Sequence, residues 1–256
     1  QPPPRSFPTQ TSPWRIGEPD QVIRMLGRHS LPAEGYIDYK IVLLPQLFLE
    51  DTWVQSVEIL PDNPRVLHHC NLAFATIGQS FSQDNFITGR VPGGDPMVLD
   101  HGTALKIPKG SVLALQAHYV TTGKPETCSL AVGLKFPKEP VLKQLHHSIV
   151  STSRFAIPPG APAHRVQTER VLGFDATMVG LFSHMHLRGK DMTFQVIRPG
   201  ESEAEILLRI PNYHFDWQQS YRFAPGAMKL PRGTRLQTVA HYDNSSFNPF
   251  NPDPTA

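Results

Sequence analysis

The stretch that decides the fold occurs twice, as "ALKIPKGSVLALQAHY" at Ala104–Tyr119 and as "AMKLPRGTRLQTVAHY" at Ala227–Tyr242. The copies align without a gap at an offset of 227 − 104 = 123 residues, which carries His118 onto His241. Each copy places Pro-x-Gly, a common turn sequence, before a strand-like run. A match of this length predicts an internal repeat, and therefore two related domains.

The rest of the chain is typical of β-sandwiches. Short apolar or alternating runs are separated by Pro, Gly, Asn and Asp clusters, and no amphipathic helix of convincing length is visible. We therefore predict an all-β chain with two related antiparallel, jelly-roll-like β-sandwich domains. The predicted boundaries are a flexible, proline-rich arm at 1–13, an N-terminal sandwich at 14–138 and a C-terminal sandwich at 139–256.

The repeat also predicts that the second sandwich lacks its last strand. The first copy continues into "SLAVGLKF" at residues 129–136, and the counterpart of that run would begin near 129 + 123 = 252. The sequence given has 256 residues, so the closing strand is not expected within it.

Charge and hydropathy exclude some classes of partner. Lys and Arg total 24 against 22 Asp and Glu, so the net charge of +2 gives no bulk electrostatic basis for binding nucleic acid or an anionic membrane. No apolar run is long enough to span a bilayer. The first residue is Gln, which suggests a mature or excised fragment and a periplasmic or secreted protein.

The two cysteines, Cys70 and Cys128, both belong to the first half of the chain. In an oxidising compartment they would form one disulfide, and the alternative is two buried free thiols. We predict the disulfide, because both cysteines flank the candidate metal-binding strands.

Histidine pairs mark each half. In "SHMH", His184 and His186 would point to the same face of a strand, so their rings can converge on one ion. In "VLHHC", His68 and His69 precede the first repeat copy, and His118 would complete a three-imidazole site with them. Adjacent side chains diverge on a regular strand, so that site requires a bulge or twist. Imidazole suits copper, zinc, iron and nickel alike.

Other histidines are better read as structural. A lone histidine in a β-sandwich is more often a hydrogen-bonded residue than a ligand. We apply this reading to four lone histidines and to an adjacent pair without a repeat counterpart: His29, His101, His164, His214, His146 and His147. Symmetry instead places His241 beside His184 and His186 as a third imidazole, and the alternative is that its ring caps the turn that follows it.

The ordered motifs "HH", "LQAHY", "SHMHLRGKDM", "NYHFDWQQSYRF" and "AHYDNSSFNPFNPDPT" resemble the ascorbate-dependent type II copper monooxygenases. This family includes the peptidylglycine and dopamine hydroxylating enzymes, and the chain looks closest to bacterial relatives, from Trp14 onward. The resemblance implies two copper ions, one for electron transfer and one for dioxygen activation. It also implies hydroxylation of a carbon-hydrogen bond of a small-molecule substrate, with O2 and ascorbate or a similar electron donor.

The resemblance assigns residues to these roles. His68, His69 and His118 would bind the electron-transferring copper, and His184 and His186 the catalytic copper. Gln116 matches a glutamine beside the third of these ligands. Phe182 stands where the peptide-hydroxylating relatives have an arginine for the substrate carboxylate, which favours a less polar substrate. The family's methionine ligand has no match downstream of "NPDPTA", so His241 is expected either beside the ligands His184 and His186, supporting them, or as a direct ligand.

Three alternatives come from other classes. A cupin-type single-metal enzyme would combine the His-x-His pair with Asp191, but it leaves the pair in the first half unexplained. A zinc hydrolase of the metallo-β-lactamase kind would require Asp and His directly after the His-x-His pair, where this chain has Leu187 and Arg188, so the sequence fits this class poorly. In a non-catalytic copper-binding β-sandwich module of a larger secreted assembly, the histidines would bind copper without catalysing a reaction.

Overall fold

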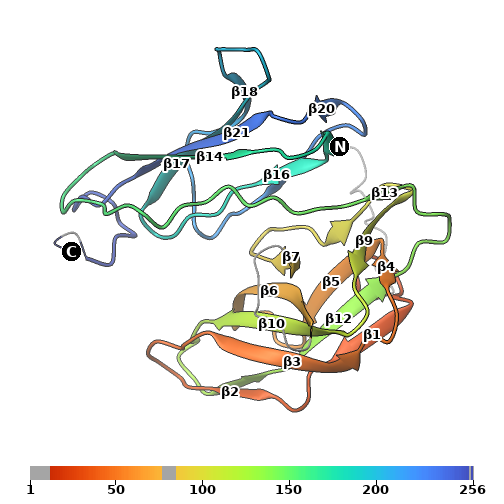
Figure 1. Ribbon diagram of the computed structural model, residues 1–256. Coiled ribbons are helices and arrows are strands. Elements are labelled where there is room, and N and C mark those ends of the chain that lie inside the picture. The colour runs from red at the N-terminus through yellow and green to blue at the C-terminus, as the bar shows by residue number, and fades with distance from the viewer. Residues whose placement is uncertain (1–11, 77–84, 254, 256) are drawn as a thin grey trace, which may run out of the picture. The chain divides into compact units, whose positions relative to one another are not determined.

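The computed structural model describes residues 12–76, 85–253 and 255 of the chain (Figure 1). The described residues form an all-β fold of antiparallel sheets, with one short parallel pair and no α-helix, which confirms the predicted fold class. In these ranges no helix has the length and apolar character needed to cross a membrane. The predicted proline-rich arm at 1–13 lies, except for its last two residues, outside the described residues.

The chain divides into two compact units. The first unit comprises Gln1–Arg90 and Pro96–His147, and the second comprises Val91–Asp95 and Ser148–Ala256. The sequence-based boundary lay after residue 138. A short segment from the first half belongs to the second unit, where the Gln219 side chain donates a hydrogen bond of 3.0 Å to the Gly93 carbonyl.

Each unit contains a four-stranded sheet built around one copy of the repeat, which we call the repeat sheet. In the first unit its order is β3 (Lys40–Leu47), β10 (Ser111–Tyr119), β6 (Leu67–Thr76) and β7 (Phe86–Arg90). In the second unit its order is β14 (His164–Val171), β21 (Arg235–Tyr242), β17 (Gly189–Ile197) and β18 (Glu205–Ile210). The second copy therefore occupies the same place in its sheet as the first copy (Figure 1).

Further sheets complete the first unit. One has the order β1 (Gln21–Arg24), β12 (Leu130–Lys135), β5 (Ser56–Pro61) and β8 (Met97–Val98). The smaller ones are β11 (Glu126–Cys128) with β2 (His29–Leu31), and β13 (Lys143–Gln144) with β9 (Thr103–Ile107) and β4 (Thr52–Val54). Alternate residues of β10, including Leu113, Leu115 and Tyr119, are buried in one large apolar core.

The second unit has smaller counterparts of these sheets. They are β15 (Ala176–Met178) with β20 (Met228–Leu230), and β16 (Gly180–Phe182) with β19 (Ser220–Arg222). The pairing of β16 with β19 repeats that of β5 with β8. Within the described part of the second unit no strand corresponds to β12, and the buried apolar residues form two small clusters.

The Pro-x-Gly sequence forms the same turn in both units. The amide of Ser111 donates to the Pro108 carbonyl at 3.2 Å, and that of Thr234 donates to the Pro231 carbonyl at 3.1 Å. The glycine of each turn has a left-handed φ, 80° in one copy and 88° in the other. A type II turn requires this φ at its third residue, which explains why both copies keep glycine there.

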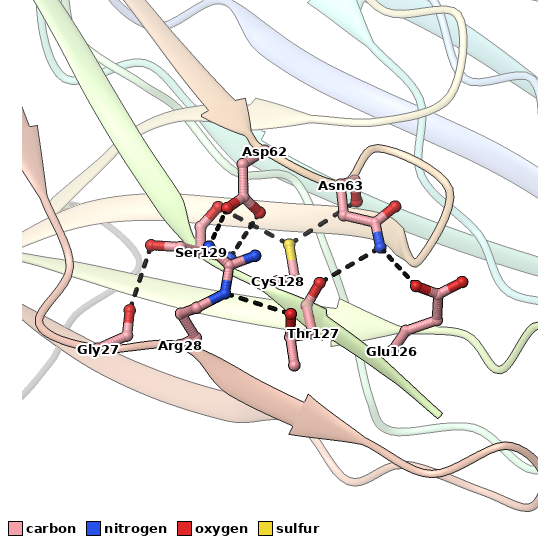
Figure 2. Close-up of polar contacts among 8 residues, drawn as sticks. All are labelled: Gly27, Arg28, Asp62, Asn63, Glu126, Thr127, Cys128 and Ser129. Atoms are coloured by element: carbon pink, nitrogen blue, oxygen red, sulfur yellow. Dashed lines mark hydrogen bonds and ion pairs between the residues drawn. The ribbon is translucent and has the colours of Figure 1, made fainter. Parts of the chain in front are cut away.

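The predicted disulfide is wrong: Cys70 and Cys128 are free, buried thiols. Figure 2 shows the Cys128 sulfur between the main chains of Asn63 and Ser129, whose carbonyl oxygens lie at 3.7 and 3.8 Å. The Cys70 thiol in turn donates to the Asn71 carbonyl at 3.8 Å. Each sulfur is therefore directed at a main-chain oxygen beside it. Burial raises the pKa of Cys70, and the neighbouring Cys128 raises it further, so the reactive thiolate is disfavoured.

Candidate metal centres

The first histidine cluster lies in the repeat sheet of the first unit. His68 and His69 are on β6, and His118 is on the adjacent β10. In the pairing of these strands His118 faces His69, the next residue Tyr119 faces Leu67, and His68 is the extra residue. The strand irregularity that two adjacent histidines require is therefore present at this position.

The three rings lie within reach of a single ion. One potential ligand atom from each of His68, His69 and His118 lies within 4.8 Å of the others, and the Nδ1 atoms of His68 and His69 are 3.1 Å apart. Ring centroids are separated by 4.9 to 5.4 Å. Metal-imidazole bonds of about 2.0–2.1 Å put two nitrogens on one ion no more than about 4 Å apart. The observed separations are close to that spacing, so this donor set could hold a metal ion.

Tyr39 covers this cluster, and sequence reasoning missed it. Its hydroxyl lies 3.2 Å from Nε2 of His69, and its ring stacks on His118 at a centroid distance of 5.0 Å and an interplanar angle of 26°. Burial raises the pKa of Tyr39, so the phenol stays neutral. Because the hydroxyl engages Nε2 of His69, Nδ1 is the nitrogen of that ring directed at His68.

Gln116 lies on the same face of β10 as His118, two residues earlier. It faces Asn71 of β6, whose side-chain amide donates to the Gln116 Oε1 at 3.2 Å. The structure thus places Gln116 beside the cluster, joined by a hydrogen bond to the strand that carries His68 and His69.

The second histidine pair lies just beyond a strand. His184 and His186 follow the end of β16, in an extended segment outside any ladder. Burial alternates along it, with Ser183 and Met185 buried and both histidines exposed, so the two rings share one side. Their centroids are 5.1 Å apart, within the range found in the first cluster, and their planes meet at 77°.

The histidines were expected within a strand, and the comparison of the two units explains the difference. At the offset between β5 and β16, 180 − 56 = 124, His184 and Met185 correspond to Leu60 and Pro61. In the first unit those residues pair with β12. The described part of the second unit has no such partner, so the equivalent segment is extended without a ladder.

Two side chains from "YHFDWQ", at residues 213–218, hold this segment. The Tyr213 hydroxyl accepts a hydrogen bond from the Met185 amide at 2.9 Å and donates to the Met185 carbonyl at 2.5 Å. The fully buried Gln218 presents Oε1 to Nδ1 of His184 at 2.8 Å. Although the His186 side chain is exposed on one side, desolvation by the groups packed around it lowers its pKa, and the neighbouring His184 lowers it further, which favours the neutral imidazole that binds metals.

His241 does not form a three-imidazole group with this pair. Its Nδ1 lies 2.7 Å from Oδ1 of Asp191, the residue of β17 that faces His241 of β21. Among the described residues, the one group of three or more His, Cys, Asp or Glu side chains with metal-ligand spacing is the cluster in the first unit. The described residues therefore do not show His241 at metal-ligand spacing with His184 and His186, and the predicted role of His241 stays a prediction.

Several of the remaining histidines have ordinary structural contacts. His29 Nδ1 lies 3.0 Å from the Tyr119 hydroxyl, and His147 Nε2 donates to the Ile87 carbonyl at 2.8 Å. The exposed His101 lies 3.8 Å from a Glu139 carboxylate oxygen.

Comparisons with known proteins name no relative for these sites. No family model matches the chain, and no curated protein matches it. Among solved structures, vicilin from Capsicum annuum aligns with 82% of this chain and 77% of its own chain at 10% identity. Its TM-score of 0.15 is too low to support an argument about fold or function.

Proposed function

We propose that this chain binds copper at two places and is a copper-dependent monooxygenase. In this proposal it hydroxylates a carbon-hydrogen bond of a small organic substrate with O2 and a reductant such as ascorbate. The observation that carries the proposal is the convergence of His68, His69 and His118 from two strands, with one ligand atom of each within 4.8 Å of the others. The resemblance of the ordered histidine motifs to the ascorbate-dependent copper enzymes selects copper among the metals that imidazole binds.

The second place is the pair His184 and His186. Copper supplies one-electron chemistry with dioxygen that side chains cannot perform unaided. The protein's own contribution is to hold the two imidazoles on one exposed side, through Tyr213 at the main chain and Gln218 at a ring nitrogen. Phe182, 43% exposed and two residues before His184, offers an apolar surface toward the same side. This favours a substrate without a carboxylate at that position.

The test is copper counting followed by an oxygen assay. We expect the metal-free chain to take up two equivalents of Cu(II), and His118→Ala and His184→Ala to lose about one equivalent each, since losing a ligand opens a site. His101→Ala is the matched control, because that histidine is exposed and outside both places, and it should keep two equivalents. Unchanged copper stoichiometry and affinity in His118→Ala would contradict the first centre.

Oxygen consumption with ascorbate and a panel of apolar substrates then separates catalysis from binding. Turnover above that of free copper, lost in His184→Ala, supports the monooxygenase. Two bound equivalents with no substrate-dependent oxygen consumption would instead indicate a non-catalytic copper-binding module.

A further inference from the structure

We infer that Gln218 is a positioning residue that fixes which ring nitrogen of His184 is available to a metal. The role of this ring nitrogen in metal binding rests on the proposed function, whereas the position of the proton on His184 depends only on contacts within the chain. Gln218 is 1% exposed, whereas His184 lies at the surface, so a buried amide holds an exposed imidazole.

The orientation of the amide follows from its two hydrogen bonds. Gln218 Nε2 donates to the Phe215 carbonyl at 2.9 Å, and a carbonyl oxygen can only accept. The other end of the amide, Oε1, must then face Nδ1 of His184, at 2.8 Å. Because Oε1 is an acceptor, Nδ1 must carry the proton.

A neutral imidazole protonated at Nδ1 has its lone pair on Nε2, which makes Nε2 the ligand nitrogen of His184. A hydrogen bond from the second ring nitrogen is the usual way in which proteins orient a metal-binding histidine. Here the amide is itself fixed by the main chain of the same short segment. The ring is therefore oriented before any metal arrives.

The test uses the metal-free full chain with ¹⁵N-labelled histidine. Long-range ¹H–¹⁵N spectra at neutral pH should show His184 mainly as the Nδ1–H tautomer, and a dominant Nε2–H tautomer in the wild type would overturn the inference. In Gln218→Met, which keeps the length and removes the acceptor, the population should shift toward Nε2–H. Gln218→Glu keeps an acceptor opposite Nδ1 but loses the donor to the Phe215 carbonyl, so it should restore the Nδ1–H tautomer only in part.

Cu(II) affinity provides the second readout. Gln218→Met should weaken binding at the His184 and His186 pair by about 10- to 100-fold and leave the first centre unchanged. Gln218→Glu, which keeps the acceptor for His184 but loses the donor to Phe215, should restore the affinity in part. Gln219→Met is the matched control, because Gln219 bonds to Gly93 instead of His184, and its affinity should equal that of the wild type. Equal affinities in Gln218→Met and Gln219→Met would overturn the positioning role.

If Gln218→Met does not fold, the tautomer of His184 in the wild type by itself tests the inference. An Nδ1–H tautomer without copper uptake would refute the proposed function and leave the structural inference standing.

Discussion

The repeat sheets of the two units share a backbone framework and differ in the side chains at one bulge. Strand order, the Pro-x-Gly turn and two register shifts recur in both sheets. In the first unit the bulge holds His68 and His69 opposite His118. In the second unit Lys190 and Asp191 occupy the corresponding positions opposite His241.

This difference shows that the backbone of a repeated domain and the chemistry of its site vary independently. His241 keeps the place of His118, but Asp191 stands at the position of His69 and contacts Nδ1 of His241. The second histidine pair lies instead beyond β16, on a segment whose first-unit counterpart belongs to a ladder. The two proposed copper places are therefore not related by the repeat.

The largest expected effect comes from rebuilding the first site in the second unit. Replacing Lys190→His together with Asp191→His would place two imidazoles in the bulge opposite His241. If the bulges are equivalent, the double variant should bind one more equivalent of Cu(II) than the wild type, since three imidazoles make a metal site. Equilibrium copper counting measures this gain.

The control for that experiment is Lys190→Ala with Asp191→Ala. It removes the Asp191 contact to His241 and the Lys190 hydrogen bond of 2.8 Å to the Pro162 carbonyl, without adding ligands. Its copper stoichiometry should match that of the wild type. A histidine variant that also gains no copper would show that the matching register does not make the two bulges equivalent.

The next largest effect is a difference in stability cost when equivalent leucines are truncated in the two hydrophobic cores. Leu113 and Leu236 are equivalent at the offset of 123, but Leu113 is fully buried in the large core and Leu236 is 8% exposed in a four-residue cluster. Leu113→Ala should cost about 3–5 kcal/mol and Leu236→Ala about 2–3 kcal/mol, because the smaller core leaves less of a cavity. Hydrogen exchange resolved by unit measures both values, and equal costs would contradict the difference between the cores.

Local patterns predicted much of this fold. The two sandwiches followed from alternation and from the repeat, because strand faces and turn glycines depend on neighbouring residues. The need for a bulge at His68 and His69 followed from the same geometry. The convergence of these residues with His118 matches the first predicted ligand group, although the identity of the metal stays a prediction.

The misses are all non-local. Asp191 faces His241 only through a register between strands that lie far apart in the sequence, so symmetry alone did not predict this contact. Tyr39 and Gln218 reach histidines 30 and 34 residues away, and no spacing rule points to them. The disulfide failed for a similar reason, because shared location in one half does not direct two sulfurs at each other.

A smaller effect tests the shared turn. Gly110→Ala and Gly233→Ala each place a side chain at a left-handed φ, where an L-residue is strained by about 1–2 kcal/mol. The costs should be equal within error if the turns are the same. Gly173→Ala is the control, because its added Cβ meets nothing within 4 Å and its φ is not left-handed. Thermal or denaturant unfolding measures all three, and unequal costs for the two turn variants would show that their surroundings differ.

The smallest effect concerns Tyr213, which holds the main chain of Met185 where Pro61 of the first unit pairs with Leu130. Tyr213→Phe should cost about 0.5–1.5 kcal/mol at neutral pH, the usual net value of a hydrogen bond.

Burial raises the pKa of Tyr213 to about 12, so the folded state favours the neutral phenol. That stabilisation is complete below the unfolded pKa of about 10 and is lost as the pH rises toward 12. The free-energy difference between wild type and variant should therefore shrink between pH 10 and 12 in denaturant titrations. A difference that stays constant over this range would mean that the hydroxyl does not hold Met185 as a neutral donor and acceptor.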